Sequence, residues 1–220
     1  LNTESFTARW PVNVFDYMIR NRGEVLELTL QHLGMVAVAM ALAVLIGIPL
    51  GILLTRRRGL SQWVLGAANI IQTVPSLALF GFLIPVPLLG VGPRTAIVAL
   101  TLYALLPVIR NTYVGISQVD PAVVEAARGM GMTGGQMLWL VQVPLSLPVI
   151  LAGIRVATVI AIGTATIAAA IGAGGLGEYI YRGVAGPKNY LLLAGAIPAA
   201  LMAVVADASL GWAEQRLRSR

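Results

Sequence analysis

The chain has 220 residues, of which 58% are apolar and only 11% are charged, with a net charge of +6. Soluble domains carry about 25% charged residues, so this chain cannot cover a water-facing surface. The composition therefore excludes a soluble domain and predicts an all-α integral membrane protein. The positive charge comes almost entirely from arginines beside apolar runs, a pattern typical of membrane topology rather than of a nucleic-acid-binding surface.

Several kinds of chemistry are absent from the sequence. There is no cysteine and a single histidine, His32, which excludes disulfides, thiolate catalysis and metal sites built from clusters of these residues. The phosphate-binding pattern G-x-x-x-x-G-K-[ST] does not occur, so we expect no ATP site in this chain. No constellation of nucleophile, base or metal ligands is present, and we expect no enzyme activity, metal or cofactor here.

In chain order, residues 1–31 are a predicted N-terminal interfacial segment, in which residues 14–31 have the pattern of an amphipathic helix lying on the membrane surface. Residues 32–215 form the predicted transmembrane domain. Residues 216–220 are a predicted basic cytoplasmic tail.

A membrane-spanning helix needs about 20 mostly apolar residues. Five stretches meet this length, at residues 33–54, 63–84, 95–115, 148–171 and 190–212. Residues 134–153 are uncharged and long enough to form a sixth span. However, Pro144 and Pro148 interrupt that stretch, and a sixth crossing would place the arginines of the tail outside. We therefore predict five spans.

Arginine placement predicts the orientation. Arg56, Arg57 and Arg58 follow the first span, and cytoplasmic connections carry an excess of basic residues. Five spans then put the N-terminus outside, residues 120–144 inside, the Gly-rich connection 172–190 outside and the tail inside.

Residues 120–144 carry the clearest local signals. Asp120 is a good helix N-cap, and Pro121 fits the first helical position. Gly131 predicts the end of this short helix, and Thr133 predicts a capping box that starts the next one. A helix this short is not stable alone and needs a partner surface.

The pattern Glu125-Ala126-Ala127, then Gly131, then Val141-x-Val143-Pro144 resembles the E-A-A-x-x-x-G-(nine residues)-I-x-L-P signature of ABC importer permeases. Two valines stand where the family pattern has Ile and Leu. In that family the segment is a cytoplasmic coupling helix that docks in a cleft of the ATPase subunit. The resemblance implies a polar contact by Glu125, alanines that fit the cleft and a turn at Gly131. The implied ATPase-coupling residues are Asp120, Glu125, Ala126, Ala127, Gly131 and Pro144.

The stretches "TVPSLALFGFLIP", "YALLPVIRNT" and "GTATIAAAIGAGGLG" are similar to the permease subunits of osmoprotectant importers, which carry glycine betaine, choline, carnitine and related quaternary ammonium compounds. "GAGGLG" is shared with methionine permeases of the same type I importer fold, so an amino-acid permease stays the alternative. An ion-driven secondary transporter would need carboxylates at mid-depth and inverted repeats. The spans contain only Asp207, close to one end, and no repeat is visible.

The resemblance implies a permease subunit in a bacterial or archaeal plasma membrane that moves solute by alternating access. The implied partners are a cytoplasmic ABC ATPase that binds ATP and Mg²⁺, an extracytoplasmic substrate-binding protein and membrane lipids. A second permease copy or a paralogue is also expected, because five spans cannot comfortably enclose a pathway.

Two charged residues lie inside predicted spans. Arg155 and Asp207 fall at similar depth near the cytoplasmic ends of the fourth and fifth spans. A charge inside a span is costly unless it is paired or wet, so we predict that they pair. The alternative is that Arg155 snorkels to the interface while Asp207 contacts water.

Four residues are predicted along the translocation path. Thr164 and Thr166 offer hydroxyls in a helix of small residues, whose small faces could equally serve close helix packing. Pro75 and Ser76 open the "PSLAL" stretch, where proline either kinks a moving helix or is tolerated because neighbours satisfy the freed carbonyls.

Aromatic residues are the usual way to hold a quaternary ammonium group. Phe80, Phe82, Tyr103 and Tyr113 are scattered along the middle of the sequence, so we expect no aromatic cage among them. The outer connection is either a contact surface for the binding protein or a solvated loop. The residues concerned are Glu178, Tyr179, Tyr181 and Arg182.

Overall fold

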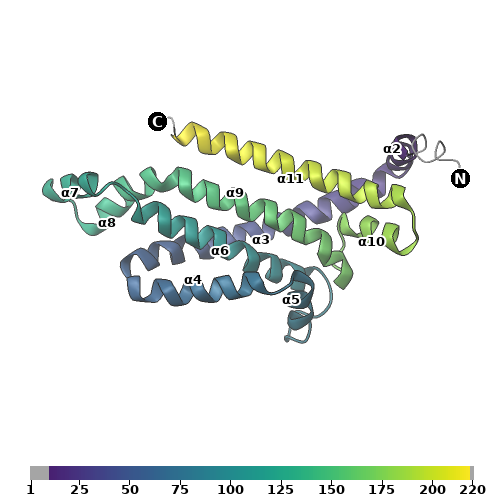
Figure 1. Cartoon of the computed structure of the whole chain (residues 1–220), viewed down its shortest axis with the longest axis horizontal. Coiled ribbons are helices and arrows are strands. Elements are labelled where there is room, and N and C mark those ends of the chain that lie inside the picture. Colours follow the sequence, from purple (N-terminus) through teal and green to yellow (C-terminus); the bar gives the residue numbers. More distant parts are fainter. Residues whose placement is uncertain (1–9, 219–220) are drawn as a thin grey trace, which may run out of the picture. The chain divides into compact units, whose positions relative to one another are not determined.

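The computed structural model describes residues 10–218, and this part of the chain consists of helices and connections without a β-strand (Figure 1). It divides into two compact units. Unit 1 holds the described residues up to Ala39 together with Val74–Leu100 and Ala161–Val204. Unit 2 holds Met40–Thr73, Thr101–Ile160 and the described residues from Val205 onward. The predicted all-α fold is confirmed.

The helices differ widely in length, and four of them contribute residues to both units. In chain order they are α2 (Trp10–Arg20), α3 (Arg22–Arg56), α4 (Arg58–Thr73), α5 (Ser76–Leu83), α6 (Pro93–Ser117), α7 (Pro121–Gly129), α8 (Gly134–Met137), the π-helical turn η1 (Leu138–Gln142), α9 (Val143–Ile167), the 3-10 turn η2 (Ala168–Ile171), α10 (Gly177–Ala185) and α11 (Asn189–Arg218).

Four helical segments in the described chain are long and apolar enough to cross a membrane, and a bent pair of helices makes a fifth candidate. The third and fifth predicted spans correspond to α6 and α11. The second prediction, one helix over residues 63–84, is wrong in detail, because the chain bends by 102° between α4 and α5. The break falls at Val74 and Pro75, since proline disfavours helical backbone in the residue before it.

The first span is longer than predicted. α3 has 35 residues, or roughly 52 Å of helix, against a hydrocarbon core of about 30 Å. The prediction of one interfacial helix over residues 14–31 is therefore wrong: the chain turns at Asn21, and residues 22–31 continue into the span. Asn21 stabilises this turn by donating from Nδ2 to the carbonyl oxygen of Tyr17 at 2.9 Å.

The fourth span begins earlier than predicted, because helical structure continues from Gly134 to Ile171. Pro144 and Pro148 lie inside this run and do not interrupt it. The π-helical turn just before Pro144 changes the hydrogen-bond register at the place where a donor is missing, which accommodates the proline. Residues 134–153 therefore form no sixth span of their own.

Two contacts determine the number of crossings. Arg56 Nη2 donates to the carbonyl oxygen of Gly134 at 2.7 Å, so both lie on one side of the membrane. Because α6 crosses once between them, α4 and α5 together must supply a second crossing. Glu24 and Arg182 form an ion pair at 2.6 Å, so an even number of crossings must separate them as well. Five spans satisfy both contacts, whereas a sixth span before α9 would separate Glu24 from Arg182.

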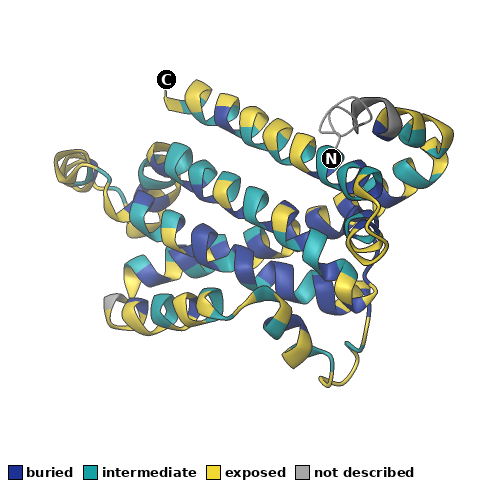
Figure 2. Cartoon of the chain, turned by 45° about the vertical axis from the view of Figure 1, so that its right-hand side comes forward, coloured by how far each residue is buried: buried dark blue, intermediate teal, exposed yellow. Residues whose placement is uncertain are grey.

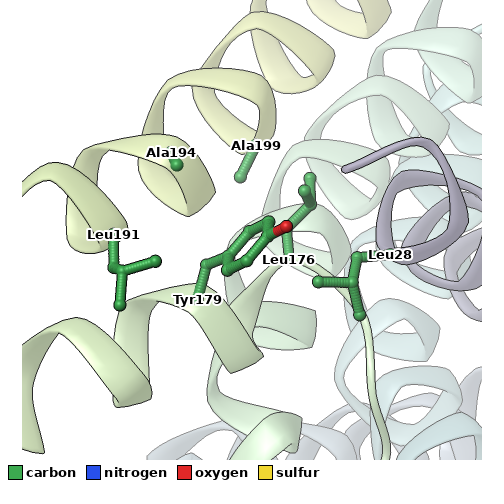
Figure 3. Close-up of a cluster of buried hydrophobic side chains, with 6 residues drawn as sticks. All are labelled: Leu28, Leu176, Tyr179, Leu191, Ala194 and Ala199. Carbon is green, nitrogen blue, oxygen red and sulfur yellow. The ribbon is translucent and has the colours of Figure 1, made fainter. Parts of the chain in front are cut away.

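Each unit has its own core. In unit 1, buried apolar residues of α3, the Gly-rich connection, α10 and α11 surround one tyrosine (Figure 3). They are Leu28, Leu176, Tyr179, Leu191, Ala194 and Ala199. In unit 2, glycines let helices approach closely, as is typical of membrane bundles. A Cβ at Gly153 would lie 2.5 Å from the Cβ of Asn111, and one at Gly51 would lie 2.6 Å from the Cβ of Thr112.

Figure 2 shows exposed residues along the long helices as well as in the connections. Many of these are large and apolar, among them Leu45, Trp63, Leu201, Val204 and Val205. Uncovered apolar surface of this extent marks faces that lie against lipid or another protein.

Candidate functional site

The segment between α6 and α9 lies at one end of unit 2, where α7 and α8 extend beyond the long helices (Figure 1). The start of α7 is formed as its sequence predicts. The Asp120 carboxylate accepts a hydrogen bond from the Ala122 amide at 2.8 Å, and Pro121 occupies the first turn. Asp120 therefore satisfies one of the amides that a helix start leaves without an internal partner.

The end of α7 is equally defined. The Met132 amide donates to the Ala127 carbonyl at 3.2 Å, and the Gly131 amide donates to the Arg128 carbonyl at 3.0 Å. This pair of bonds is a Schellman motif, which needs a left-handed residue at its centre. Gly131 has φ of +82°, so its lack of a side chain is what permits the turn.

A capping box starts α8, as predicted. The Gln136 amide donates to the Thr133 hydroxyl at 3.3 Å, while the Thr133 amide donates to the Gln136 side-chain carbonyl at 2.9 Å. Local hydrogen bonds thus fix both ends of α7 and the start of α8.

The three residues of the Glu-Ala-Ala pattern do not share one environment. Glu125 and Ala126 are exposed, whereas Ala127 is only 2% exposed and packs inside unit 2. In the chain alone, Ala126 is thus accessible to a partner while Ala127 is covered, and a role for either alanine in docking stays a prediction. Adjacent helical residues point about 100° apart, so one alanine faces outward while the next faces the protein's own core.

A pocket of about 400 Å³ lies between α7 and the ends of α3 and α6. Its charged lining residues are Arg56, Glu125 and Arg128. Arg56 also ties the end of α3 to the start of α8 through the Gly134 carbonyl. A short helix with fixed ends, an exposed carboxylate and a hollow beneath it can act as a docking element, but it holds no group arranged for covalent chemistry.

The structure brings the predicted charged pair together. Arg155 Nε and Nη2 donate to the two carboxylate oxygens of Asp207 at 2.6 and 2.8 Å. Glu214 adds a longer contact to Nη1 at 3.5 Å, which the sequence analysis missed, although Glu214 follows Asp207 by about two helical turns. Gly211 lies against the guanidinium, since a Cβ there would be 3.0 Å from Nη1.

The four residues predicted along the translocation path all lie in unit 1. Pro75 is exposed and precedes α5, and Ser76 is its first residue. Thr164 and Thr166 lie near the end of α9, where the Thr166 hydroxyl already donates to the Gly163 carbonyl at 2.7 Å. Helix α5 contacts η2, which directly follows α9. Their role in transport stays a prediction.

The outer connection, residues 172–190 with helix α10, has a buried aromatic residue and a cluster of charged residues. Tyr179 is fully buried, so it is a core residue rather than a surface contact. Arg182 pairs with Glu24 at 2.6 Å and with Glu178 at 2.7 Å. The hydrogen bond to Glu24 raises the pKa of Arg182 above its usual value, and burial raises the pKa of Tyr179.

Three tyrosines gather in unit 1, which the sequence analysis missed because they lie far apart in the chain. The ring centroids of Tyr17 and Tyr190 are 5.3 Å apart, and those of Tyr17 and Tyr179 are 5.9 Å apart in an edge-to-face arrangement. No local sequence pattern links α2 to α10 and α11, so only the tertiary fold shows this cluster.

The fold defines the class of protein. It is similar to a chain of the methionine ABC transporter MetNI in an inward-facing conformation, with a TM-score of 0.82 and 23% identity over 89% of this chain and 97% of that chain. It is also similar to a chain of an amino acid ABC transporter crystallised with histidines, with a TM-score of 0.72, 20% identity and coverage of 94% and 98%. The architecture is that of the membrane subunit of an ABC importer.

Residues 47–219 match the family described as binding-protein-dependent transport system inner membrane component, and the chain belongs to this family. It is 45% identical over 210 residues to the osmoprotectant import permease protein OsmW of Salmonella typhimurium strain LT2, covering 94% of this chain and 96% of that protein. It is 48% identical over 202 residues to the glycine betaine/carnitine/choline permease protein OpuCD of Bacillus subtilis strain 168, covering 91% and 87%. The resemblance to osmoprotectant importer permeases is thereby confirmed.

Proposed function

We propose that this chain is the membrane subunit of an ATP-driven importer for quaternary ammonium osmoprotectants, with glycine betaine, choline and carnitine as the substrate class. One observation carries the proposal: a chain similar over more than nine-tenths of its length to osmoprotectant permeases presents a capped helix, α7, whose Glu125 is exposed beyond the spans. The alternative, an amino-acid permease, rests on the shared fold alone.

The proposed mechanism divides the work among several chains. A separate ATPase binds ATP and Mg²⁺ and grips α7 through Glu125 and Ala126. A second permease copy or paralogue completes the pathway, and an extracytoplasmic binding protein delivers the solute. Closure of two ATPases on ATP then draws two copies of α7 together and favours one of two bundle conformations, which is a population shift driven by differential binding.

The burial of Ala127 suggests how movement of α7 reaches the rest of the chain. Because Ala127 packs inside unit 2, movement of α7 is transmitted to the chain through the buried side of the same short helix whose exposed side contacts the ATPase. The caps at Asp120 and Gly131 would keep α7 rigid while it is pulled.

Uptake in vesicles tests the proposal. The permease would be reconstituted with its ATPase and binding protein and supplied in turn with labelled glycine betaine, choline, carnitine and methionine. We expect ATP-dependent uptake of at least one quaternary ammonium compound and none of methionine. Uptake of methionine alone would leave the fold assignment intact and refute the substrate class.

A further inference from the structure

A surface pocket of about 310 Å³ lies in unit 1, and its described lining includes none of the residues predicted for the translocation path or the coupling segment. Its lining residues are Asp16, Tyr17 and Arg20 of α2 and Tyr190 of α11. Its volume falls at the lower end of the range for small-molecule sites.

The aromatic walls of this pocket are fixed by the core beneath them. The Tyr17 ring packs edge-on against fully buried Tyr179, with a centroid distance of 5.9 Å and an interplanar angle of 79°. Tyr17 also packs against Tyr190 at 5.3 Å with an angle of 53°. Both Tyr17 and Tyr190 pack against the buried cluster of Figure 3 yet remain partly exposed, so they are ordered rings that a ligand can reach.

The described lining of the pocket carries one acidic and one basic side chain. Asp16 and Arg20 are exposed and lie one helical turn apart on α2. Within residues 10–218, neither forms an ion pair. Among the described residues, the pocket therefore offers one negative group, one positive group and aromatic surface.

This combination fits one ligand chemistry better than others. A trimethylammonium group has no N–H to donate, so aromatic surface and a nearby carboxylate are what attract it. A carboxylate is matched by a guanidinium, which can donate two parallel hydrogen bonds. A ligand that carries both groups complements the two rings, Asp16 and Arg20 at once.

We propose that the pocket lined by Asp16, Tyr17, Arg20 and Tyr190 is a low-affinity binding site for zwitterionic trimethylammonium carboxylates such as glycine betaine. The proposal rests on the proposed function for its substrate class. Arginine placement predicts that the N-terminus and the connection before α11 are both extracytoplasmic, and the Tyr17–Tyr190 contact agrees that they share a side. The site would then be a first contact of the solute with the permease.

The presence of both Asp16 and Arg20 predicts an order of binding affinity among related ligands. Choline carries the same cation but no carboxylate, so it leaves Arg20 without a partner, and we expect it to bind more weakly than glycine betaine. The compound 3,3-dimethylbutanoate has the shape of glycine betaine with carbon in place of the charged nitrogen, and we expect it to bind least.

Saturation-transfer NMR on the whole transporter in lipid nanodiscs, without the binding protein, tests the site at millimolar ligand. We expect transfer to the methyl groups of glycine betaine, weaker transfer to choline and the weakest to 3,3-dimethylbutanoate. Tyr190→Leu should weaken glycine betaine binding about two- to fivefold, the effect of one exposed cation–aromatic contact. Tyr190→Phe keeps the aromatic face and should retain binding.

Two further variants complete the design. Arg20→Gln should reduce glycine betaine to the level of choline, because only the zwitterion uses that residue. Tyr181→Leu, which removes an exposed tyrosine from α10 outside the pocket, should change nothing. Equal binding by Tyr190→Leu and the unaltered protein, or equal binding of 3,3-dimethylbutanoate and glycine betaine, would overturn the proposal.

The uptake experiment in vesicles, combined with the NMR experiment, distinguishes a failure of the pocket proposal from a failure of the proposed function. Uptake of quaternary ammonium compounds without a signal that depends on Tyr190 would overturn the pocket and leave the proposed function standing. A signal that depends on Tyr190, in a complex that takes up only methionine, would support the pocket and refute the proposed function.

Discussion

At the scale of single residues, the Arg155–Asp207 pair shows how far a membrane sequence specifies a contact. Both residues were predictable as partners, because charges are rare in spans and these two fall at similar depth. The sequence did not predict the additional contact with Glu214 or the space left by Gly211. Both depend on which face of α11 is turned toward Arg155. The two carboxylates together hold the guanidinium between α9 and α11.

We expect Asp207→Asn to lower the thermal unfolding midpoint of the purified permease, because it removes the bidentate partner of Arg155. The double variant Asp207→Asn with Arg155→Gln should recover part of the loss, since neither side chain is then a charge without its partner. Thermal unfolding in detergent measures both variants. A double variant less stable than Asp207→Asn would show that the two residues do not act as a pair.

At the scale of elements, α7 was the most predictable part of the molecule. Asp120, Gly131 and Thr133 act on their near neighbours in sequence, so their capping roles could be inferred without the fold. Two other features could not be inferred without the fold, because both depend on contacts between distant segments. They are the 102° bend between α4 and α5 and the cluster of Tyr17, Tyr179 and Tyr190. For the same reason, the burial of Ala127 within unit 2 could not be inferred from the Glu-Ala-Ala pattern.

Gly131→Ala should destabilise the end of α7 by about 1–2 kcal/mol, because Gly131 has a left-handed conformation that a Cβ disfavours. Hydrogen exchange should show faster exchange of the Met130 and Met132 amides, which close the end of the helix. Gly135→Ala is the matched control: Gly135 lies in α8 with nothing near its Cβ position, so exchange at α7 should not change. Unaltered exchange in Gly131→Ala would refute a structural role for this turn.

At the scale of the whole molecule, contacts within each unit imply five crossings. The Arg56–Gly134 contact in unit 2 and the Glu24–Arg182 pair in unit 1 each require an even number of crossings between their members. Arginine placement then predicts that α7 is cytoplasmic and α10 is extracytoplasmic. The sequence predicted five spans from proline and arginine placement, and these long-range contacts support that count independently.

Single cysteines test this topology, because the chain has none of its own. Val184→Cys in α10 and Met130→Cys after α7 replace side chains that are 64% and 71% exposed. In intact cells, a membrane-impermeant maleimide should label Val184→Cys, whereas Met130→Cys should react only after permeabilisation. Labelling of both from outside would contradict five crossings.

ATP hydrolysis by the complete complex in lipid tests the central claim most directly. We predict that glycine betaine, choline or carnitine, added with the binding protein, stimulates hydrolysis and that methionine does not. Glu125→Ala should abolish the stimulation, whereas Gln118→Ala, an exposed change just before α7, should preserve it. Stimulation by methionine alone, or stimulation that persists in Glu125→Ala, would contradict an osmoprotectant importer coupled through α7.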